Sequence, residues 1–521
     1  MQPMKSTAAS TDKTIAQLQS RIVDLETKVR FYEEQFNLLQ HKRFGRSSEK
    51  PDTQAELFNE AESIIAEEER AHQDDTEADS AQITITYTRK KPGRKPLPKD
   101  LPGEQIRYEL PKSEQVCGCG HALHEIGEDT SEQPDIIPAQ IKVIEHIRVK
   151  YACRQCDNGI KTAPEPAQPI EKSIASPGLL AHIAVARYTD ALPLYRQEAI
   201  FKRLNIDINR TSMANWMIKT AQLNQPLLQR LIHYQLQQSI IQADETPVQV
   251  LNEPGRKAQS QSCMWLYQSG SSGVSPPVII YDYQPGRSGL FAKNHLQDFK
   301  GQYLQTDGYS GYAQVCTPQS GIVSVGCRAH ARRKFDEVIK ALKGKNVKPG
   351  KAHMALNTIA KLYAIEKQCK TMSAEQRYLV RQKKSQPILN QFKQWLDKSA
   401  EQVPPKQLPG KAIHYALNQW TQLTCHIEDS HPEIDNNAAE RRIKPFVIGR
   451  KNWLFSQTPN GAMASATLYS LIETAKANKL EPFAYIRYIL TELPRLGRHA
   501  EPEAFDALLP WLCAEKIQAL Q

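Results

Sequence analysis

Three acidic side chains of this 521-residue chain have the types and the setting that phosphoryl transfer requires. Asp244 and Asp307 each follow an apolar run, and Glu440 lies in a segment of good helix formers. Carboxylates that converge from separate elements can hold two divalent cations, which clamp the attacking and leaving oxygens of an in-line displacement. The three acids therefore predict a Mg²⁺ (or Mn²⁺) site for polynucleotidyl transfer.

Each acid also has a structural interpretation. Asp307 with Gly308 could form a simple turn, and Asp244 could cap the segment that follows it. Glu440 could be an exposed residue paired with Lys444 at i+4. The metal site is favoured because the acids occur in the right order on the expected elements. The residues that could replace one of the three in the site are Asp435, Asp282 and Glu245.

The elements that would position these acids begin near residue 239. Apolar runs predict strands at 239–244, 263–268, 277–283, 301–306 and 322–327, with helices at 289–299, at 309–315 and from His330 onward. Three strands followed by strands that alternate with helices indicate a mixed sheet covered on both faces. Ribonuclease H-like folds have this order, in which the first and fourth strands are neighbours, so Asp244 and Asp307 would meet at one sheet edge.

The stretch between Asp307 and Glu440 is too long for the bare fold. Helical patterns at 353–367, 374–400 and 411–424 predict an all-α insertion there.

Cationic and polar side chains are expected to grip DNA at several places. The net charge of +10 and the isoelectric point near 8.9 favour an anionic partner, although that signal is weak alone. Proline and glycine keep the basic segment 89–99 extended, so it could follow a phosphate backbone or be a solvated linker. Two helices around residues 205–211 resemble a helix-turn-helix, although any pair of short helices can look this way. The residues expected to contact DNA are Arg94, Lys95, Thr211, Ser212, Asn215, Arg332, Arg333, Arg441, Arg442, Lys444, Arg450 and Lys451.

Two aromatic residues follow the last basic run. Trp453 and Phe455 could stack on an unpaired base, but we expect both to pack in the core.

Two cysteine pairs predict a structural zinc site. Their members are Cys117, Cys119, Cys153 and Cys156. The second pair has C-x-x-C spacing, whereas the first is the tighter C-x-C, where His121 or His124 could replace one thiolate. The alternative is four reduced thiols that are only near neighbours.

The N-terminal segment 15–42 divides into four unbroken heptads with matched flanking charges. The residues at the a and d positions are Ile15, Leu18, Ile22, Leu25, Val29, Tyr32, Phe36 and Leu39. This pattern predicts a parallel coiled coil, and therefore a homodimer or higher oligomer, with an amphipathic helix docked on its own chain as the alternative. The N-terminus has no apolar signal core and no stretch long enough for a membrane helix, so we expect a cytoplasmic protein without a membrane partner.

Several motifs together resemble the transposases of the bacterial insertion sequence 66 family, a DDE-type group. The matching stretches are Gly127-Glu-Asp-Thr-Ser-Glu-Gln, Lys150-Tyr-Ala-Cys-Arg-Gln-Cys, Ala243-Asp-Glu-Thr-Pro, Gln305-Thr-Asp-Gly-Tyr, Cys327-Arg-Ala-His-Ala-Arg-Arg-Lys-Phe, Asn436-Asn-Ala-Ala-Glu-Arg-Arg-Ile-Lys-Pro and Ile448-Gly-Arg-Lys-Asn-Trp-Leu-Phe. The resemblance implies that Asp244, Asp307 and Glu440 are the catalytic triad. It also implies small accessory proteins as partners. One departure concerns zinc, because Val116 stands where many relatives have the first cysteine of a C-x-x-C pair.

The expected fold class is therefore multidomain α/β. A ribonuclease H-like mixed-sheet core with an all-α insertion is joined to an N-terminal coiled coil, a small zinc-binding β module and a helical DNA-binding segment. The expected parts are a coiled coil (1–45), an acidic then basic linker (46–105), a zinc-finger-like DNA-binding domain (106–165), a helix-turn-helix-like segment (170–236), the first part of the core (237–349), the insertion (350–428), the last part of the core (429–480) and a C-terminal helical domain (481–521).

The expected activity is metal-dependent cleavage of double-stranded DNA at the terminal repeats of the element, followed by strand transfer into target DNA. Two alternatives stay open at this point. One is a non-catalytic DNA-binding regulator derived from a transposase, and the other is a ribonuclease H-like nuclease that cuts without joining.

Overall fold

The computed structural model describes most of the chain from residue 141 onward. The described residues are 141–152, 160–269, 275–341, 350–497 and 500–519, together with Leu18, Arg21, Ile22, Leu25, Lys28, Val29, Tyr32, Glu33 and Phe36 of the N-terminal segment. Residues 48–165 form one compact unit, and residues 166–521 belong to another. In the first unit, β1 (Lys150–Ala152) pairs antiparallel with β2 (Ile160–Thr162).

The second unit is built on a mixed sheet of five strands in the order β5-β4-β3-β6-β7. Its strands are β3 (Ile240–Gln249), β4 (Gln261–Ser269), β5 (Val278–Gln284), β6 (Tyr303–Gln305) and β7 (Val323–Val325). β3, β4 and β5 are antiparallel neighbours, whereas β6 pairs parallel with both β3 and β7. The predicted order of strands along the chain is confirmed, as is the pairing of the first strand with the fourth. The sheet is consistent with a ribonuclease H-like core of the DDE type.

The two faces of the sheet are covered by different helices, because side chains alternate along each strand. On one face, Met264 and Leu266 of β4 pack with α14 (Asn437–Trp453) and α15 (Pro459–Ala477). On the other face, Trp265 and Tyr267 pack with α7 (Gly289–His295) and the 3-10 helix η2 (Ser310–Gln314). Asp244 lies on the α14 face, and Glu245 lies on the α7 face.

The edge strand β5 is closed by hydroxyl groups of α15. The Tyr281 N–H donates to Ser470 Oγ at 2.8 Å, and the Ile279 N–H donates to Thr474 Oγ1 at 3.0 Å. An edge whose backbone groups are satisfied in this way cannot pair with another strand, so the sheet ends there.

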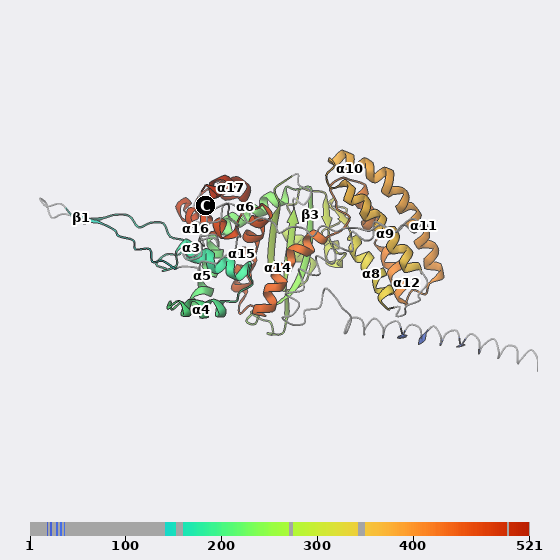
Figure 1. The fold of residues 1–521 in the computed structure, drawn as a ribbon, viewed down its shortest axis with the longest axis horizontal. Helices are drawn as coiled ribbons and strands as arrows, with labels where there is room; N and C mark the ends of the chain where they lie inside the picture. The colour runs from blue at the N-terminus through green and yellow to red at the C-terminus, as the bar shows by residue number, and fades with distance from the viewer. Residues whose placement is uncertain are drawn as a thin grey trace, which may run out of the picture. The chain divides into compact units, whose positions relative to one another are not determined.

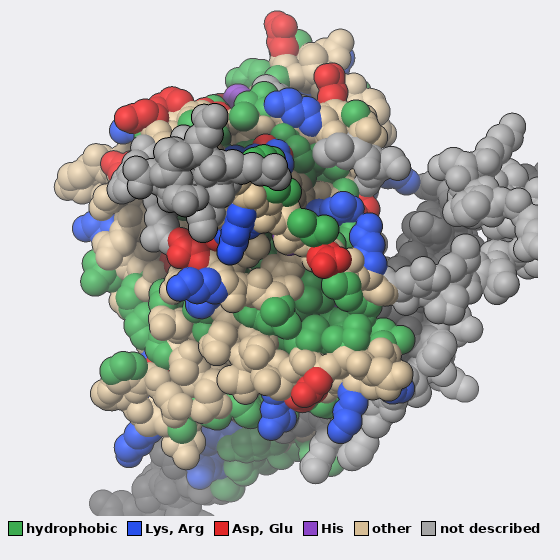
Figure 2. All heavy atoms as spheres, turned by 90° about the vertical axis from the view of Figure 1, so that its left-hand side faces the viewer, with side chains coloured by type: hydrophobic (Ala, Val, Ile, Leu, Met, Phe, Trp, Pro, Cys, Tyr) green, Lys and Arg blue, Asp and Glu red, His purple; other side chains and the backbone are tan. Residues whose placement is uncertain are grey.

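Helices on both sides of the sheet complete this unit (Figure 1). One group consists of α3 (Pro177–Tyr188), α4 (Leu194–Arg203), α5 (Arg210–Leu223), α6 (Gln225–Leu236), α15, α16 (Pro482–Leu496), the 3-10 helix η5 (Pro502–Leu508) and α17 (Pro510–Gln518). Leu180, Ile183, Leu471 and Ile486 are among the buried residues that join this group into one core with the sheet. On the face that Figure 2 turns to the viewer, Lys and Arg side chains are dispersed among acidic, polar and hydrophobic ones rather than gathered in one basic patch.

The other group is the helical stretch between β7 and α14. It contains α8 (Arg328–Ala341), α9 (Lys351–Cys369), α10 (Ala374–Val380), the π-helical turn η3 (Arg381–Ser385), α11 (Gln386–Gln402), α12 (Leu408–Asn418), α13 (Trp420–Thr424) and the 3-10 turn η4 (Cys425–Ile427). Phe335 and Ile359 are buried in its own hydrophobic core. The insertion is helical where helices were predicted, but the helix expected at 411–424 is divided into α12 and α13, and the one expected at 374–400 contains the π-helical turn η3. Helix α8 packs against this group.

The strand predicted at 239–244 is longer, because the pairing of β3 with β4 continues to Gln249. Two helices are shorter than predicted. The helix expected at 289–299 ends at His295, and the one at 309–315 is a 3-10 turn. The chain turns sharply before β6, where a Cβ on Gly301 would lie 2.1 Å from the Gln238 carbonyl oxygen. That contact requires glycine at residue 301 and lies beyond the end of α7. Among the described residues no helix is both long and apolar enough to cross a membrane.

Candidate active site

Asp244 and Asp307 lie level with each other on neighbouring parallel strands. The register pairs Gln242 of β3 with Gln305 of β6. Two residues further along each strand stand Asp244, still within β3, and Asp307, just beyond β6. Because side chains alternate along β3, Asp244 lies on the same face as Gln242. The charge of Asp307 acts on Asp244, so the two carboxylates are near each other. The two carboxylates are thus placed at the same edge of the sheet, as predicted.

The surroundings of Asp244 make its negative charge unfavourable. Burial raises the pKa of its carboxyl from 3.8 to about 7, and the charges of Glu245, Asp307 and Glu440 act in the same direction. A hydrogen bond from the Glu245 N–H, 2.8 Å from Asp244 Oδ1, opposes this shift. A group of carboxylates that disfavour one another's ionisation is suited to binding a cation, which removes the repulsion.

Two buried amide side chains, Gln242 of β3 and Gln305 of β6, lie two residues before the two acids. Gln242 Nε2 donates to Gln305 Oε1 at 3.1 Å, and both side chains are buried. Gln305 Nε2 in turn donates to the Glu433 carbonyl oxygen at 2.7 Å. Gln305 therefore touches β3, β6 and the loop that leads to α14, which are the three segments that carry Asp244, Asp307 and Glu440.

Asn436 ties the start of α14 to the sheet. Its Nδ2 donates to the Ala243 carbonyl oxygen at 2.9 Å, directly before Asp244. Its backbone N–H donates to Cys327 Sγ at 3.2 Å, and its carbonyl oxygen accepts the Glu440 N–H at 3.2 Å. Glu440 thus stands in the first turn of a helix whose N-terminal end is bonded to the strand of Asp244.

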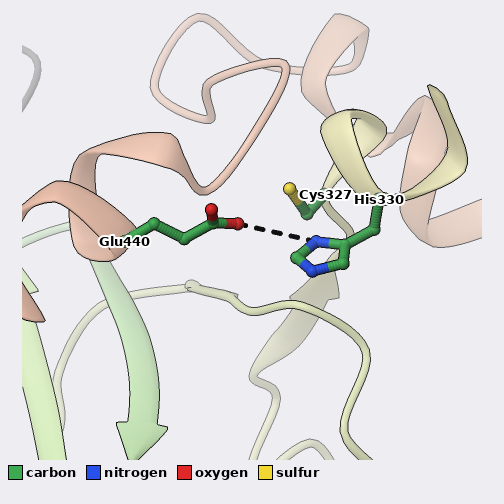
Figure 3. A group of neighbouring side chains, drawn as sticks. All are labelled: Cys327, His330 and Glu440. Atoms are coloured by element: carbon green, nitrogen blue, oxygen red, sulfur yellow. Dashed lines mark ion pairs between the residues drawn. The ribbon is translucent and has the colours of Figure 1, made fainter. Parts of the chain in front are cut away.

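The Glu440 carboxylate faces the N-terminal end of α8 (Figure 3). His330 Nδ1 is 3.7 Å from Glu440 Oε1, and Arg333 Nη2 is 3.7 Å from Oε2. These are its ion pairs, so the pairing with Lys444 considered from the sequence is not the one observed. The His330 and Glu440 atoms are buried and have no hydrogen-bond partner in the part of the chain that the structure describes.

These residues fit a divalent cation. The oxygens of Asp244, Asp307 and Glu440 are the ligands that Mg²⁺ and Mn²⁺ prefer. Glu440 Oε1 is buried and accepts no hydrogen bond from the described residues, so it can coordinate a cation. Cys327 Sγ and His330 also lie within 4.8 Å of a Glu440 oxygen, and they would add softer donors on that side.

The three acids that could have replaced members of this group are bound elsewhere. Glu245 accepts Tyr312 Oη–H at 2.7 Å and forms an ion pair with Arg287 on the opposite face of β3. Asp282 lies on β5, two strands from β3, and accepts Gln284 Nε2 at 2.9 Å.

Asp435 has both carboxylate oxygens engaged within the protein. It accepts the Tyr363 hydroxyl at 2.8 Å and the Asn437 N–H at 3.1 Å. Its position fixes the turn before α14 rather than offering a free ligand.

The basic residues expected near the site fall into two sets. Arg441, Lys444 and Lys451 of α14 are exposed, as are Arg332 and Arg333 of α8.

Two further arginines of α14 hold the helix to the protein. Arg442 forms an ion pair with the buried Glu473 at 3.7 Å. Arg450 Nη1 donates to Thr246 Oγ1 at 3.0 Å and to the Pro247 carbonyl oxygen. Burial lowers the pKa of Arg450. For DNA contact, the exposed set is therefore better placed than Arg442 and Arg450.

The helical segment has the elements expected of a helix-turn-helix. Its second helix is α5, where Thr211 and Asn215 are exposed and Ser212 is half-buried. The Ser212 N–H donates to Asn209 Oδ1 at 2.8 Å, so this backbone group is used to begin the helix. The remaining expected site residues, Arg94, Lys95, Cys117, Cys119, Cys153 and Cys156, lie outside the described residues.

Three residues that contact the acids or their segments were given no role from the sequence. They are His330, Gln305 and Asn436. The C-x-x-H spacing of Cys327 and His330 was a usable signal, because it puts a thiol and an imidazole on one turn of a basic helix. Gln305 had no comparable signal, since one glutamine in an apolar run does not reveal its partner on another strand.

Comparison with known proteins finds family matches in four segments of the chain. Residues 172–464 match the family described as Transposase IS66 family. Residues 114–157 match the zinc-finger binding domain of transposase IS66, residues 32–106 match Transposase C of IS166 homeodomain, and residues 470–511 match the IS66 C-terminal element.

Similar proteins occur in Sinorhizobium fredii. Uncharacterized protein y4jD is 35% identical over 80% of this chain and 81% of the relative. Uncharacterized protein y4hP is 30% identical over 94% of this chain and 88% of the relative. Uncharacterized protein y4qI is 34% identical over 74% of this chain and 71% of the relative.

Proposed function

The chain belongs to the transposase IS66 family, and from this premise we propose that it cleaves DNA at the ends of its insertion sequence and joins those ends to target DNA. The observation that carries the proposal is the placement of Asp244 and Asp307 at one level of parallel strands, with Glu440 on a helix bonded to β3. Family membership implies a transposase and a divalent metal. The two reaction steps and the residue roles are our inference.

In this proposal Asp244, Asp307 and Glu440 hold the divalent cations. When bound, such cations stabilise charge on phosphoryl oxygens and lower the pKa of a bound water. Gln305 and Asn436 fix the relative positions of the acid-bearing segments. Water attacks the phosphodiester in the first step, and the freed 3′-hydroxyl attacks target DNA in the second.

The DNA backbone would run along the exposed side of α14 and the start of α8. Arg441, Lys444 and Lys451 are exposed on α14, and Arg332 is exposed on α8. Contacts to phosphates position the DNA without reading its sequence. Recognition of the terminal repeats is assigned to the helical segment with Thr211 and Asn215 and to the zinc-finger-like region.

Two further parts of the proposal concern zinc and assembly. Cys117, Cys119, Cys153 and Cys156 would bind structural Zn²⁺, which suits the family match over residues 114–157. The heptads of residues 15–42 would pair two chains, so that two DNA ends are held together. Small accessory proteins of the element are further expected partners.

The test uses purified full-length protein, Mg²⁺ and a labelled fragment that carries the ends of its own element. We expect metal-dependent nicking and joining by the wild type and neither reaction by Asp307→Asn, with end binding retained. Asp298→Asn, which changes an exposed acid, is the matched control.

The possible outcomes separate the proposal from its competitors. Nicking without joining would indicate a ribonuclease H-like nuclease. Specific end binding without cleavage, even after addition of the other products of the element, would indicate a regulator. Joining by the Asp307→Asn variant would show that Asp307 is not a required residue of the active site.

A further inference from the structure

The chain leaves α14 through a turn that a leucine adopts with difficulty. Leu454 has φ 64° and ψ −51°. The Phe455 N–H donates to the Trp453 carbonyl oxygen at 2.8 Å, which closes a three-residue turn around Leu454. This turn is rare, and a positive φ strains any residue with a side chain. Strain of this kind concentrates at functional sites.

The strained residue gains little from burial. Leu454 is 65% exposed and the adjacent Phe455 is 40% exposed. Trp453, by contrast, packs against Phe446 with ring centroids 5.5 Å apart. The expectation of core packing therefore holds for Trp453, whereas Phe455 is exposed next to Leu454.

A chain reversal alone explains the turn but not the leucine. Just beyond it, the Ser456 N–H donates to the Gln249 carbonyl oxygen at 2.9 Å, so the chain must turn back toward the end of β3. Glycine would make the same turn without strain. The leucine side chain destabilises the fold at this position and is largely exposed to solvent. A contact with another molecule would explain why leucine is present here.

The turn lies at the opposite end of α14 from Glu440 of the proposed active site. Glu440, Lys444, Ile448 and Lys451 recur at spacings of four, four and three residues, so they lie along one side of α14 that leads to Leu454. Leu454 follows Glu440 by fourteen positions, which corresponds to a rise of about 21 Å along the helix axis. That length corresponds to about six nucleotides of duplex DNA.

We propose that Leu454 and Phe455 form an apolar wedge that inserts between bases of the bound DNA and holds one base out of the stack. This inference rests on the proposed function and adds a second contact to it, with the base rather than the phosphate. Exposed apolar side chains beside cations are the means by which proteins unstack DNA at a step. The exposed cations Lys444 and Lys451 match the charge of a nucleic acid. Even with Ile448, which is 46% exposed on the same side of α14, these side chains form too small a surface for a stable protein interface.

The experiment places 2-aminopurine, whose fluorescence rises when it leaves the stack, at successive positions about four to eight nucleotides from the cleavage point, a window set by the length of α14. The Asp307→Asn variant is used so that DNA is bound but not cut. We expect a fluorescence rise at one or two adjacent positions. In the same background, Phe455→Ala and Leu454→Gly should abolish most of that rise. Leu512→Ala, which changes a leucine of α17 that is 54% exposed, should leave it unchanged.

Leu454→Gly gives a second, independent readout. Glycine relieves the backbone strain, so the Tm of this variant should equal or exceed that of the wild type while cleavage falls about tenfold. A substrate with a mismatch at the unstacked position should restore cleavage by Leu454→Gly, because the base is already loosened.

The outcomes distinguish the wedge from the function on which it rests. If the protein neither binds nor cuts element ends, both proposals fail. The wedge is wrong if the protein binds the ends but the fluorescence of 2-aminopurine does not rise at any position. It is also wrong if Leu454→Gly and Phe455→Ala leave fluorescence and cleavage unchanged. In both cases the transposase assignment stands.

Discussion

At the scale of single residues, the fold changes the chemistry of Asp244 most directly. An aspartate in an unfolded chain has a pKa near 4, and burial with neighbouring carboxylates raises that of Asp244 to about 7. Between these values the folded protein keeps a proton that the unfolded chain has released. Stability therefore falls as the pH rises from about 4 to about 7 in the absence of a divalent metal. The catalytic role proposed for Asp244 and this loss of stability have the same cause.

A prediction follows for Asp244→Asn, which cannot ionise. At pH 8 without added divalent metal, the variant should melt several degrees above the wild type, and at pH 4 the difference should vanish. Asp298→Asn, at an exposed position, should match the wild type at both pH values. Adding Mg²⁺ at pH 8 should raise the Tm of the wild type more than that of Asp244→Asn. Equal melting of both proteins at pH 8 would show that Asp244 is not a destabilising charge.

At the scale of elements, the site depends on how three segments are joined. Gln305 is the residue that contacts all of them, through Gln242 and the Glu433 carbonyl oxygen. Arg381 adds support from the insertion. Its guanidinium donates to the carbonyl oxygen of His426 in η4 and to those of Asp429 and Pro432 in the loop that leads to α14. It does so from a π-helical turn, a distortion often found near functional sites. The insertion thus helps to hold the segment of Glu440 in place.

Replacing Gln305 tests this arrangement. Gln305→Leu removes its hydrogen bonds and leaves buried partners unsatisfied, at a cost of about 1–3 kcal/mol each. We expect a lower Tm, a cleavage rate reduced about 10- to 100-fold, and a higher Mg²⁺ concentration for half-maximal cleavage, as for other residues that orient metal ligands. The exposed neighbour in Gln302→Leu is the control. A lower Tm with unchanged Mg²⁺ dependence would mean that Gln305 has only a structural role.

The sequence pattern predicts most of the strands and helices and the three acids. It does not predict the hydrogen bonds that connect the segments carrying those acids. Apolar runs and their order predict β3, β6 and the strand neighbours, because burial on both faces leaves a continuous apolar signal. The same runs end at Asp244 and Asp307, which places those acids at one edge. The bond between Gln242 and Gln305 depends on the register of segments that are far apart in sequence, and no local pattern encodes it. The cap made by Asn436 and the π-helical turn at Arg381 are hidden for the same reason.

At the scale of the whole molecule, transposition requires two DNA ends in one complex, and a single chain offers one set of acids. We propose that the N-terminal segment pairs two chains. In the single chain its described apolar residues are all exposed, namely Leu18, Ile22, Leu25, Val29, Tyr32 and Phe36. They occupy a and d positions of the heptads, which a second copy of the segment would cover.

Charges placed on this surface should separate the chains without affecting the active site. We expect the wild-type chain of 59.0 kDa to have at least twice that mass in solution, and Ile22→Glu combined with Leu25→Glu to have the single mass. Glutamate keeps the helical propensity of the segment, so lost pairing would reflect the buried charge and not a broken helix. Ser20→Glu, at the outward f position of the preceding heptad, should keep the larger mass. In the assay with element ends, the double variant should still nick single ends but lose joining of paired ends by more than about tenfold, because nicking needs one set of acids and paired joining needs two. Light scattering of the three proteins, followed by the joining assay, checks both statements. Paired joining by a monomeric double variant would move the pairing function from these heptads to another part of the chain.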